Sequence, residues 1–395
     1  MNFTHDSHLK LIPLNIIQDK KHFIVEDPTS GEFYEMPEVC IEAIRLLNEG
    51  NSLGEIEREL KEKYPTEEVD LLDFAQQLLE LQLVTEIDGV KVETKEKEKL
   101  PQGFLRVSPQ LGNFFFNKAA YFVYGALFIG NVVLFAANPS LFPTYKDLFI
   151  FDYMFLNILA WMLLSFIFVL IHELGHILAM RAFNLPTKLE IGHRLFLVVF
   201  ETDMGPVWKL PPRNRNVLYL AGLCFDTVIL FLALICQLLL SGQSGMHPGV
   251  LDVIVLDTFI RIVYQCCIYM KTDLYYVFEN MSGCYNLMES AQQVLRKWVP
   301  FLNQADKETV IYPEERRTVL IYSVFYLLGV GLTLLLFAFY YIPQLLFAWK
   351  KVLPGFSQGV DTLPFWDAAM FVLQIFIVLL LLLFSWQKKY LRRRA

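Results

Sequence analysis

Residues 149–180 read FIFDYMFLNILAWMLLSFIFVLIHELGHILAM, a long and mostly apolar run. It is long and apolar enough to cross a bilayer as a helix, because about 20 apolar residues span the hydrocarbon core. Its second half nevertheless carries His172, Glu173 and His176. Ionisable side chains inside a membrane are costly unless they are paired or bind a metal ion. The stretch therefore predicts a membrane helix that carries a metal site.

The three ionisable residues have the spacing H-E-x-x-H. Two His four residues apart lie on one face of a helix, about 6 Å apart along its axis, so both imidazoles can hold one metal ion. Glu173 projects beside them, and we expect it to be the general base that takes a proton from a water activated by Zn²⁺. The same spacing occurs by chance in soluble chains. The cost of burying these groups in hydrocarbon argues against chance here.

Composition divides the chain into two environments. Of the 395 residues 55% are apolar, and the mean hydropathy is +0.40, whereas residues 1–100 hold 23 Asp and Glu against 11 Lys and Arg, a net charge of −12. We therefore expect a polytopic α-helical membrane protein of about six transmembrane helices with a small N-terminal α+β domain. The predicted spans are residues 119–137, 150–182, 215–241, 251–280, 318–346 and 364–386.

Positive charge sets the expected orientation of these spans. With the N-terminus inside, loops 183–214 and 281–317 and the C-terminal end carry 14 Lys and Arg, while the outer loops hold three Lys. We therefore expect both termini in the cytosol. No charged-then-apolar leader precedes the acidic region, so residues 1–100 are also expected to stay there.

Depth in the membrane suggests a third metal ligand. His172 and Asp273 each lie about 22 residues beyond the outer start of a predicted span, and equal depth is what a shared metal ion requires. Three protein ligands and one water form the usual catalytic zinc site, and a carboxylate serves well as the third. The alternative is that Asp273 is interfacial and neutralised by Lys271.

Asp226 is the rival carboxylate, about midway along the span 215–241. An unpaired carboxylate is expensive there, so it should face the site or a wet cavity. Three roles remain open. It could hydrogen-bond the substrate backbone, stay protonated as a packing residue, or replace Asp273 on the metal.

The loop after the H-E-x-x-H helix predicts a short hairpin. Residues 187–200 read TKLEIGHRLFLVVF, with β-branched and aromatic residues around a central Gly-His-Arg turn. An edge strand beside the metal could hold a peptide extended by strand addition. A hairpin that only caps the bundle is the alternative. Ionisable residues of this loop are expected to be solvated, namely Glu190, His193, Glu201 and Asp203.

These motifs resemble those of the site-2-type intramembrane metalloproteases, in the branch of peptide zinc metalloproteases. The similarity covers about residues 115–290. It implies zinc ligands His172, His176 and Asp273, with Glu173 as the general base. Four segments carry it: HELGH at 172–176, AGLCFD at 221–226, TDLYY at 272–276 and FETDMGPVWKL at 200–210.

The chain departs from that family pattern at two places. Asp226 stands where relatives often have Asn, and Thr-Asp-Leu at 272–274 replaces the more familiar Leu-Asp-Gly. The departures bear on substrate binding more than on metal binding. Among the three roles open to Asp226, substrate binding is the one we expect.

The acidic N-terminal region predicts a winged-helix-like unit. Ser52 and Glu55 form a capping box, and Asp88-Gly89 marks a hairpin. Expected strands lie at 11–17, 23–26, 32–34, 84–87 and 90–92, and expected helices run from 37 to 50, from 52 to 64 and from 66 to 81.

This pattern resembles the PqqD-like recognition domain, which binds leader peptides of ribosomally made, modified peptides by adding a strand to its sheet. A structural or regulatory cap is the alternative. Nucleic acid is not an expected partner, because a net charge of −12 repels phosphate. The expected division is a recognition domain at 1–95, a basic tether at 96–117 and a metallopeptidase domain at 118–395.

Together these features predict a zinc-dependent endopeptidase of the bacterial cytoplasmic membrane, embedded in lipid. Its expected client is a ribosomally made precursor peptide, modified or not, that is cleaved during maturation or export. A peptide-modifying enzyme or an ABC exporter is a further expected partner. Two alternatives remain: regulated cleavage of a transmembrane signalling protein, and a peptide exporter or immunity factor without hydrolysis.

Overall fold

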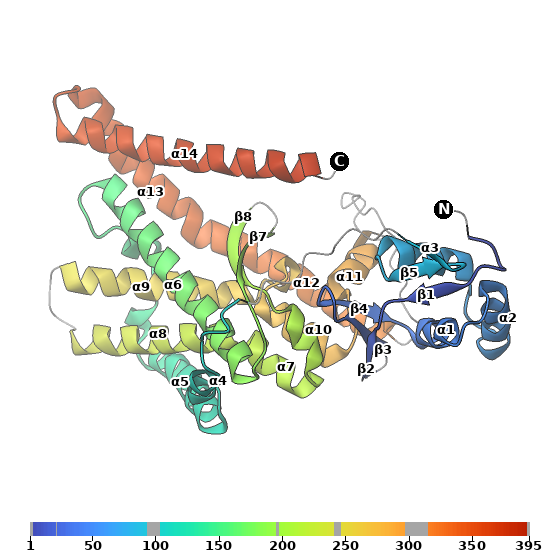
Figure 1. Cartoon of the computed structure of the whole chain (residues 1–395). Coiled ribbons are helices and arrows are strands. Elements are labelled where there is room, and N and C mark those ends of the chain that lie inside the picture. The colour runs from blue at the N-terminus through green and yellow to red at the C-terminus, as the bar shows by residue number, and fades with distance from the viewer. Residues whose placement is uncertain are drawn as a thin grey trace. The chain divides into compact units, whose positions relative to one another are not determined.

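The computed structural model describes residues 3–20, 22–92, 103–194, 197–240, 246–296 and 315–392. It divides into two compact units (Figure 1). One comprises residues 1–102 with Met204–Pro212, and the other comprises the rest. The predicted tether at 96–117 lies partly outside the described residues.

The first unit consists of two small antiparallel sheets and three helices. One sheet has the order β1-β5-β6 (Leu9–Leu11, Val84–Ile87, Val90–Lys91) and the other the order β2-β3-β4 (Asn15–Asp19, His22–Asp27, Glu32–Met36). The helices are α1 Glu38–Asn48, α2 Leu53–Lys63 and α3 Leu71–Glu80. Their apolar faces form one core that includes Ile44, Ile56 and Leu78.

The predicted helix caps, turns and strand bounds of this unit are confirmed in part. The capping box of Ser52 and Glu55 and the hairpin at Asp88-Gly89 are confirmed. The single strand predicted at 11–17 is wrong, because the chain leaves β1 at Leu11 and enters β2 at Asn15. The third helix starts later than predicted, because the Asp70 side chain caps it by accepting from the backbone N–H of Leu72 and Asp73.

A segment distant in sequence belongs to the same unit. The 3₁₀ turn Gly205–Lys209 contacts β4, and Lys209 Nζ lies 2.6 Å from Glu26 Oε1. This segment directly follows the hairpin of the second unit in the sequence.

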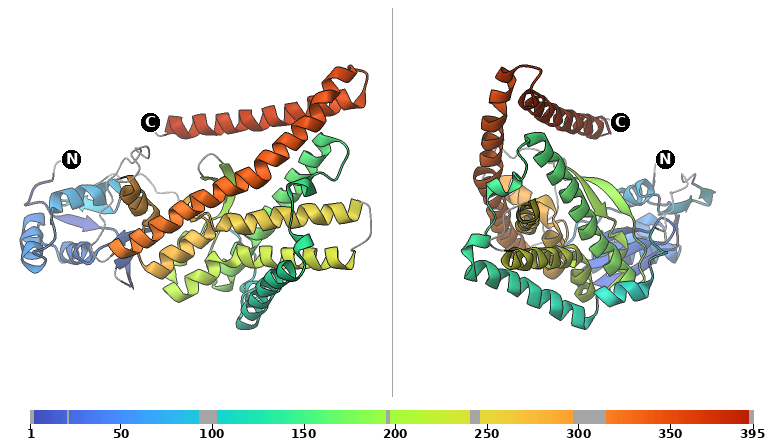
Figure 2. Two further views of the ribbon diagram at one scale, coloured as in Figure 1. Left: turned by 180° about the vertical axis from the view of Figure 1, so that it is seen from behind. Right: turned by 90° about the vertical axis from the view of Figure 1, so that its left-hand side faces the viewer.

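The second unit is mostly helical. Among the described residues, five helical stretches are long and apolar enough to cross a membrane: Lys118–Ala137, Met154–Ala182, Pro212–Leu239, Arg316–Gln358 and Leu363–Leu381. Its helices are α4 Pro109–Phe115, α5 Lys118–Ala137, α6 Met154–Ala182, α7 Pro212–Tyr219, α8 Ala221–Leu239, α9 Met246–Gln265, α10 Asp273–Ser282, α11 Leu287–Arg296, α12 Arg316–Leu336, α13 Ile342–Val352 and α14 Leu363–Arg392. A π-helical turn joins α12 to α13, and α14 then runs back (Figure 2).

The fourth predicted span is not one helix. The continuous helix expected at 251–280 is wrong, since α9 ends at Gln265 and α10 begins at Asp273. Between them Lys271 adopts a left-handed conformation with φ 54°, and Thr272 Oγ1 donates to the carbonyl of Gln265 at 2.7 Å. This hydrogen bond spans the break between α9 and α10.

The predicted hairpin is present as β7 Leu189–Arg194 and β8 Leu197–Thr202. Residues 195–196, between the two strands, lie outside the described residues. Gly-His-Arg, the predicted turn, instead forms the end of β7.

Candidate metal centre

Helices α6 and α8 pack closely at the H-E-x-x-H motif, and each helix has a glycine at this contact. A Cβ on Gly175 would lie 2.7 Å from the Ala221 carbonyl oxygen, and a Cβ on Gly222 would overlap the His172 ring. Small residues allow such approach between membrane helices. Glycine at both positions is therefore a steric requirement of this arrangement.

Three donor atoms converge where α6 meets the start of α10. His172 Nε2 lies 3.3 Å from His176 Nε2 and 3.0 Å from Asp273 Oδ2, and His176 Nε2 lies 3.4 Å from the same oxygen. All three side chains are buried. The two nitrogens come from one helical face, as their spacing predicts, and the oxygen comes from the residue that opens α10.

The other ring nitrogen of each His has its own partner. His172 Nδ1 lies 2.7 Å from Asp226 Oδ2, and His176 Nδ1 lies 2.9 Å from the Leu218 carbonyl oxygen. An acceptor at Nδ1 favours the tautomer with its proton there, which leaves the Nε2 lone pair free. Both imidazoles are thus oriented to present Nε2 to the common point.

Gln265 fixes the Asp273 carboxylate. Its Nε2 donates to Asp273 Oδ2 at 3.0 Å, and its Oε1 accepts the backbone N–H of Asp273 at 3.0 Å. Lys271 does not neutralise Asp273, since it pairs with Glu289 at 2.8 Å. The break between α9 and α10 therefore positions a carboxylate that a straight helix would not.

Glu173 is held by the end of the hairpin. The backbone N–H of Thr202 donates to Glu173 Oε2 at 2.8 Å, and the Thr202 hydroxyl donates to the same oxygen at 2.7 Å. Both hydrogen bonds engage the same carboxylate oxygen. They also fix the side chain beside the two His.

A network of polar side chains extends from the Nδ1 side of His172. Asp226 is fully buried, and its Oδ1 lies 3.7 Å from Arg261 Nη1. Arg261 also pairs with Asp257, which accepts the Trp161 indole N–H at 3.1 Å. The buried carboxylate on His172 thus has a cation nearby, as a charge of this kind needs in an apolar setting.

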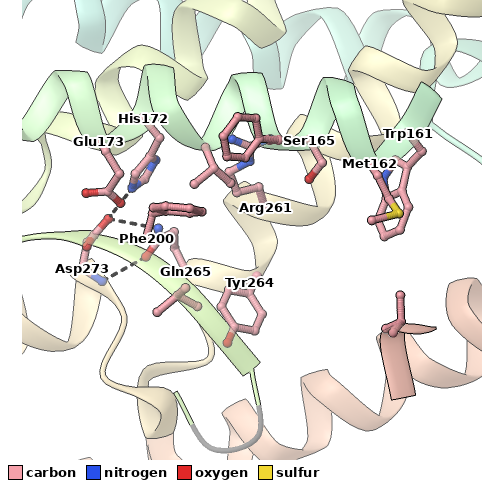
Figure 3. A pocket seen from close by; sticks show the side chains of 14 residues that line it. Trp161, Met162, Ser165, His172, Glu173, Phe200, Arg261, Tyr264, Gln265 and Asp273 are labelled. Atoms are coloured by element: carbon pink, nitrogen blue, oxygen red, sulfur yellow. Dashed lines mark hydrogen bonds and ion pairs between the residues drawn. The ribbon is translucent and has the colours of Figure 1, made fainter. Parts of the chain in front are cut away.

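A cavity of about 530 Å³ opens beside these groups, within the size range of ligand sites. Figure 3 shows His172, Glu173 and Asp273 at one end and Trp161 and Met162 at the other. Phe200 of β8 and Tyr264 of α9 line it between these ends, and Val378 comes from α14. The cavity is therefore polar at the His cluster and mostly apolar toward Trp161, although Ser165 and Arg261 also belong to its lining.

The structure gathers all five residues that the sequence singled out. His172, Glu173, His176, Asp226 and Asp273 lie in one connected cluster. Asp226 contacts His172 Nδ1, and this contact corresponds to none of the three roles considered for Asp226.

Four contributing residues were missed. Gln265 and the i,i+4 pair Asp257–Arg261 are polar positions inside a predicted span, and that was a usable signal. Thr202 gave no such signal, because Thr is common in strands.

Comparison with protein-family models, curated proteins and solved structures found no match. The fold and the cluster therefore define the class. It is a mostly helical protein whose described part has five membrane-length apolar helices and a buried group, His172, Glu173 and His176, that could hold a metal ion.

Gly222→Ala is expected to weaken metal binding by about 10–100-fold, the range found when partners that orient a metal-ligating His are lost. The added methyl would occupy the place of the His172 ring and displace it. Isothermal titration with Zn²⁺ would measure the effect.

Gly331→Ala is the matched control, because a Cβ at Gly331 in α12 meets nothing within 4 Å. Equal affinities in the two variants would contradict the steric role of Gly222.

Proposed function

We propose that the protein is a membrane-embedded zinc metallopeptidase. The single observation that carries the proposal is the triangle of His172 Nε2, His176 Nε2 and Asp273 Oδ2, with sides of 3.0, 3.3 and 3.4 Å. Tetrahedral zinc with bonds of about 2.0–2.1 Å has donors about 3.3 Å apart, so the residues fit the ion. Two imidazoles and one carboxylate are also a donor set that zinc favours.

Two carboxylates compete for the third position. Glu173 lies close enough to both His for its oxygen to join a metal group. Asp273 is favoured, because its Oδ2 is within 3.4 Å of both Nε2 atoms. The two hydrogen bonds from Thr202 meanwhile engage the Glu173 carboxylate, which keeps Glu173 distinct from the proposed metal ligands. Asp273 is thus the proposed ligand and Glu173 the proposed base.

Bound zinc would polarise a carbonyl and acidify water, the usual chemistry of this ion in hydrolases. Glu173 is the group that accepts the proton and returns it to the leaving amine. Thr202 keeps Glu173 Oε2 occupied and so leaves Oε1 for the transfer. Asp226 and the Leu218 carbonyl hold the imidazole rings in place. Asp226 is a positioning residue in this scheme and does not bind substrate.

The cavity favours an extended peptide as substrate. A peptide bond in a helix has its carbonyl occupied, so the chain must unfold before hydrolysis. Val199 and Phe200 of β8 line the cavity beside Glu173, where a strand could be added to the hairpin. This supports hydrolysis of a peptide over hydrolysis of a small polar molecule.

The proposed client is a ribosomally made precursor peptide, delivered by the N-terminal unit. The edge strand β2 is the candidate for strand addition in its second sheet, whereas β4 contacts the 3₁₀ turn Gly205–Lys209. The proposed location is the bacterial cytoplasmic membrane with both termini in the cytosol.

Co-expression with the precursor encoded beside the gene tests this function. Mass spectrometry should find a leader fragment and a core fragment with the wild type and neither with Glu173→Gln. Cleavage of a transmembrane signalling protein instead, with the precursor left whole, would favour the signalling alternative. Export of an uncut peptide would favour the exporter.

Deleting residues 1–95 is expected to reduce precursor cleavage sharply while zinc content stays the same. The reason is that this region has its own apolar core and contributes none of the donor atoms. Cleavage rates at rising precursor concentration should show a raised KM, since the loss is in binding.

Zinc content of the truncated protein serves as the control for the membrane fold. An unchanged KM for the precursor would remove the main support for leader recognition.

A further inference from the structure

A second cavity of about 300 Å³ adjoins the one beside the His cluster. It lies among α6, α13 and α14, with Ile158, Leu345 and Ile375 in its lining. Helices α13 and α14 follow residue 290, so they lie beyond the part of the chain that resembles a known family. Nothing in that resemblance implies a role for this cavity.

The two cavities share a wall. Trp161, Met162 and Val378 line both of them. In Figure 3 Trp161 and Met162 lie at the end of the first cavity that is opposite His172. Trp161 and His172 are eleven positions apart in α6, which corresponds to about 16 Å along the helix axis. An extended peptide covers that distance with about five residues.

The lining of the second cavity suits a peptide better than a lipid chain. Most of it is apolar, but Gln344 and Gln374 bring two amides into it. Gln374 Nε2 donates to the Phe155 carbonyl at 3.2 Å, while its buried Oε1 has no hydrogen-bond partner among the described residues. A buried acceptor without a donor is unfavourable. The N–H groups of an extended peptide can supply that donor, and an acyl chain has none.

We propose that the second cavity binds apolar side chains of the substrate about five residues from the scissile bond, with Gln374 Oε1 accepting a peptide N–H. The inference rests on the proposed peptidase function and adds a specificity to it. Side chains of an extended peptide alternate between its two faces, so every second apolar residue would enter. Leu345 and Leu379 at the rim are about half exposed, which leaves the cavity open toward the bilayer.

Binding can be measured apart from hydrolysis. The probe is a ten-residue peptide with Leu at alternate positions and a dansyl group at one end. It is titrated into full-length zinc-loaded Glu173→Gln protein in dodecyl maltoside. The test variant adds Leu345→Trp, which fills the cavity from its exposed rim. The matched control adds Leu346→Trp, because Leu346 is the next residue of α13, is similarly exposed at 54% against 49%, and does not line the cavity.

Leu345→Trp is expected to weaken peptide binding about tenfold or more, the effect of excluding a large apolar side chain from its site. Leu346→Trp should leave the dissociation constant unchanged. Gln374→Met keeps the volume but removes the acceptor, and it should weaken binding about 2- to 10-fold. A peptide with Ser in place of Leu should bind weakly to every variant.

Equal affinity of the Leu345→Trp and Leu346→Trp proteins for the Leu peptide would overturn the proposal. So would binding of cis-parinaric acid that Leu345→Trp abolishes while peptide binding persists, since the cavity would then be a lipid site. A wild-type protein that binds peptide with the expected dependence but hydrolyses none would refute the peptidase function and leave the peptide site standing.

Discussion

Proteins with His172→Ala, His176→Ala or Asp273→Ala are expected to purify without zinc, whereas the wild type should carry about one ion per chain. Each substitution removes one of three donor atoms that lie within 3.4 Å of one another. Two remaining protein ligands leave an incomplete site. Metal content by inductively coupled plasma mass spectrometry after dialysis would measure the loss.

Asp226→Asn and Glu173→Ala are the informative controls. Asn keeps an acceptor for His172 Nδ1, so Asp226→Asn should retain zinc at saturating concentration, with affinity lower by at most about 100-fold. Glu173→Ala should also retain it. A zinc-free Glu173→Ala protein beside a zinc-loaded Asp273→Ala protein would show that the carboxylates have exchanged roles.

Glu173→Gln is expected to lower the rate of peptide hydrolysis by about 10²–10⁴-fold, the usual contribution of a general base. Gln keeps the size of the side chain and can still accept the Thr202 hydrogen bonds, but it cannot take a proton. Single-turnover cleavage of the precursor would measure the rate. Zinc content and peptide binding should stay at wild-type values.

Thr202→Val provides a graded comparison, because it removes the hydroxyl donor and keeps the backbone N–H that also reaches Glu173. Its kcat should fall far less than that of Glu173→Gln. Full activity of Glu173→Gln would exclude Glu173 as the base and call for another proton acceptor.

The sequence predicted the helical class and the cluster of site residues, because both depend on local rules. Apolar runs of membrane length identify spans. An i,i+4 spacing puts His172 and His176 on one helical face. Because an unpaired charge is costly inside a membrane, ionisable side chains there are expected to lie next to partners. The structure gathers the same residues. The ligand roles themselves remain predictions.

What the sequence could not predict depends on contacts between distant segments. The break between α9 and α10 arises where side chains of Gln265 and Thr272 replace helical hydrogen bonds, and hydropathy alone reads that region as continuous. The contact of Thr202 with Glu173 joins residues 29 positions apart. Likewise, the place of Asp226 behind His172 depends on how closely α8 approaches α6 at Gly222.

The distance in sequence between the proposed ligands has a mechanical consequence. His172 and Asp273 are 101 positions apart, so a metal ion held between them would close a long loop, much as a covalent cross-link does. A ligand present at 100 times its dissociation constant adds about 2.7 kcal/mol to the stability of the folded state. Chelation would remove this constraint from α6, α10 and the segment between them at once. The metal ion would then stabilise the helical bundle in addition to its role in hydrolysis.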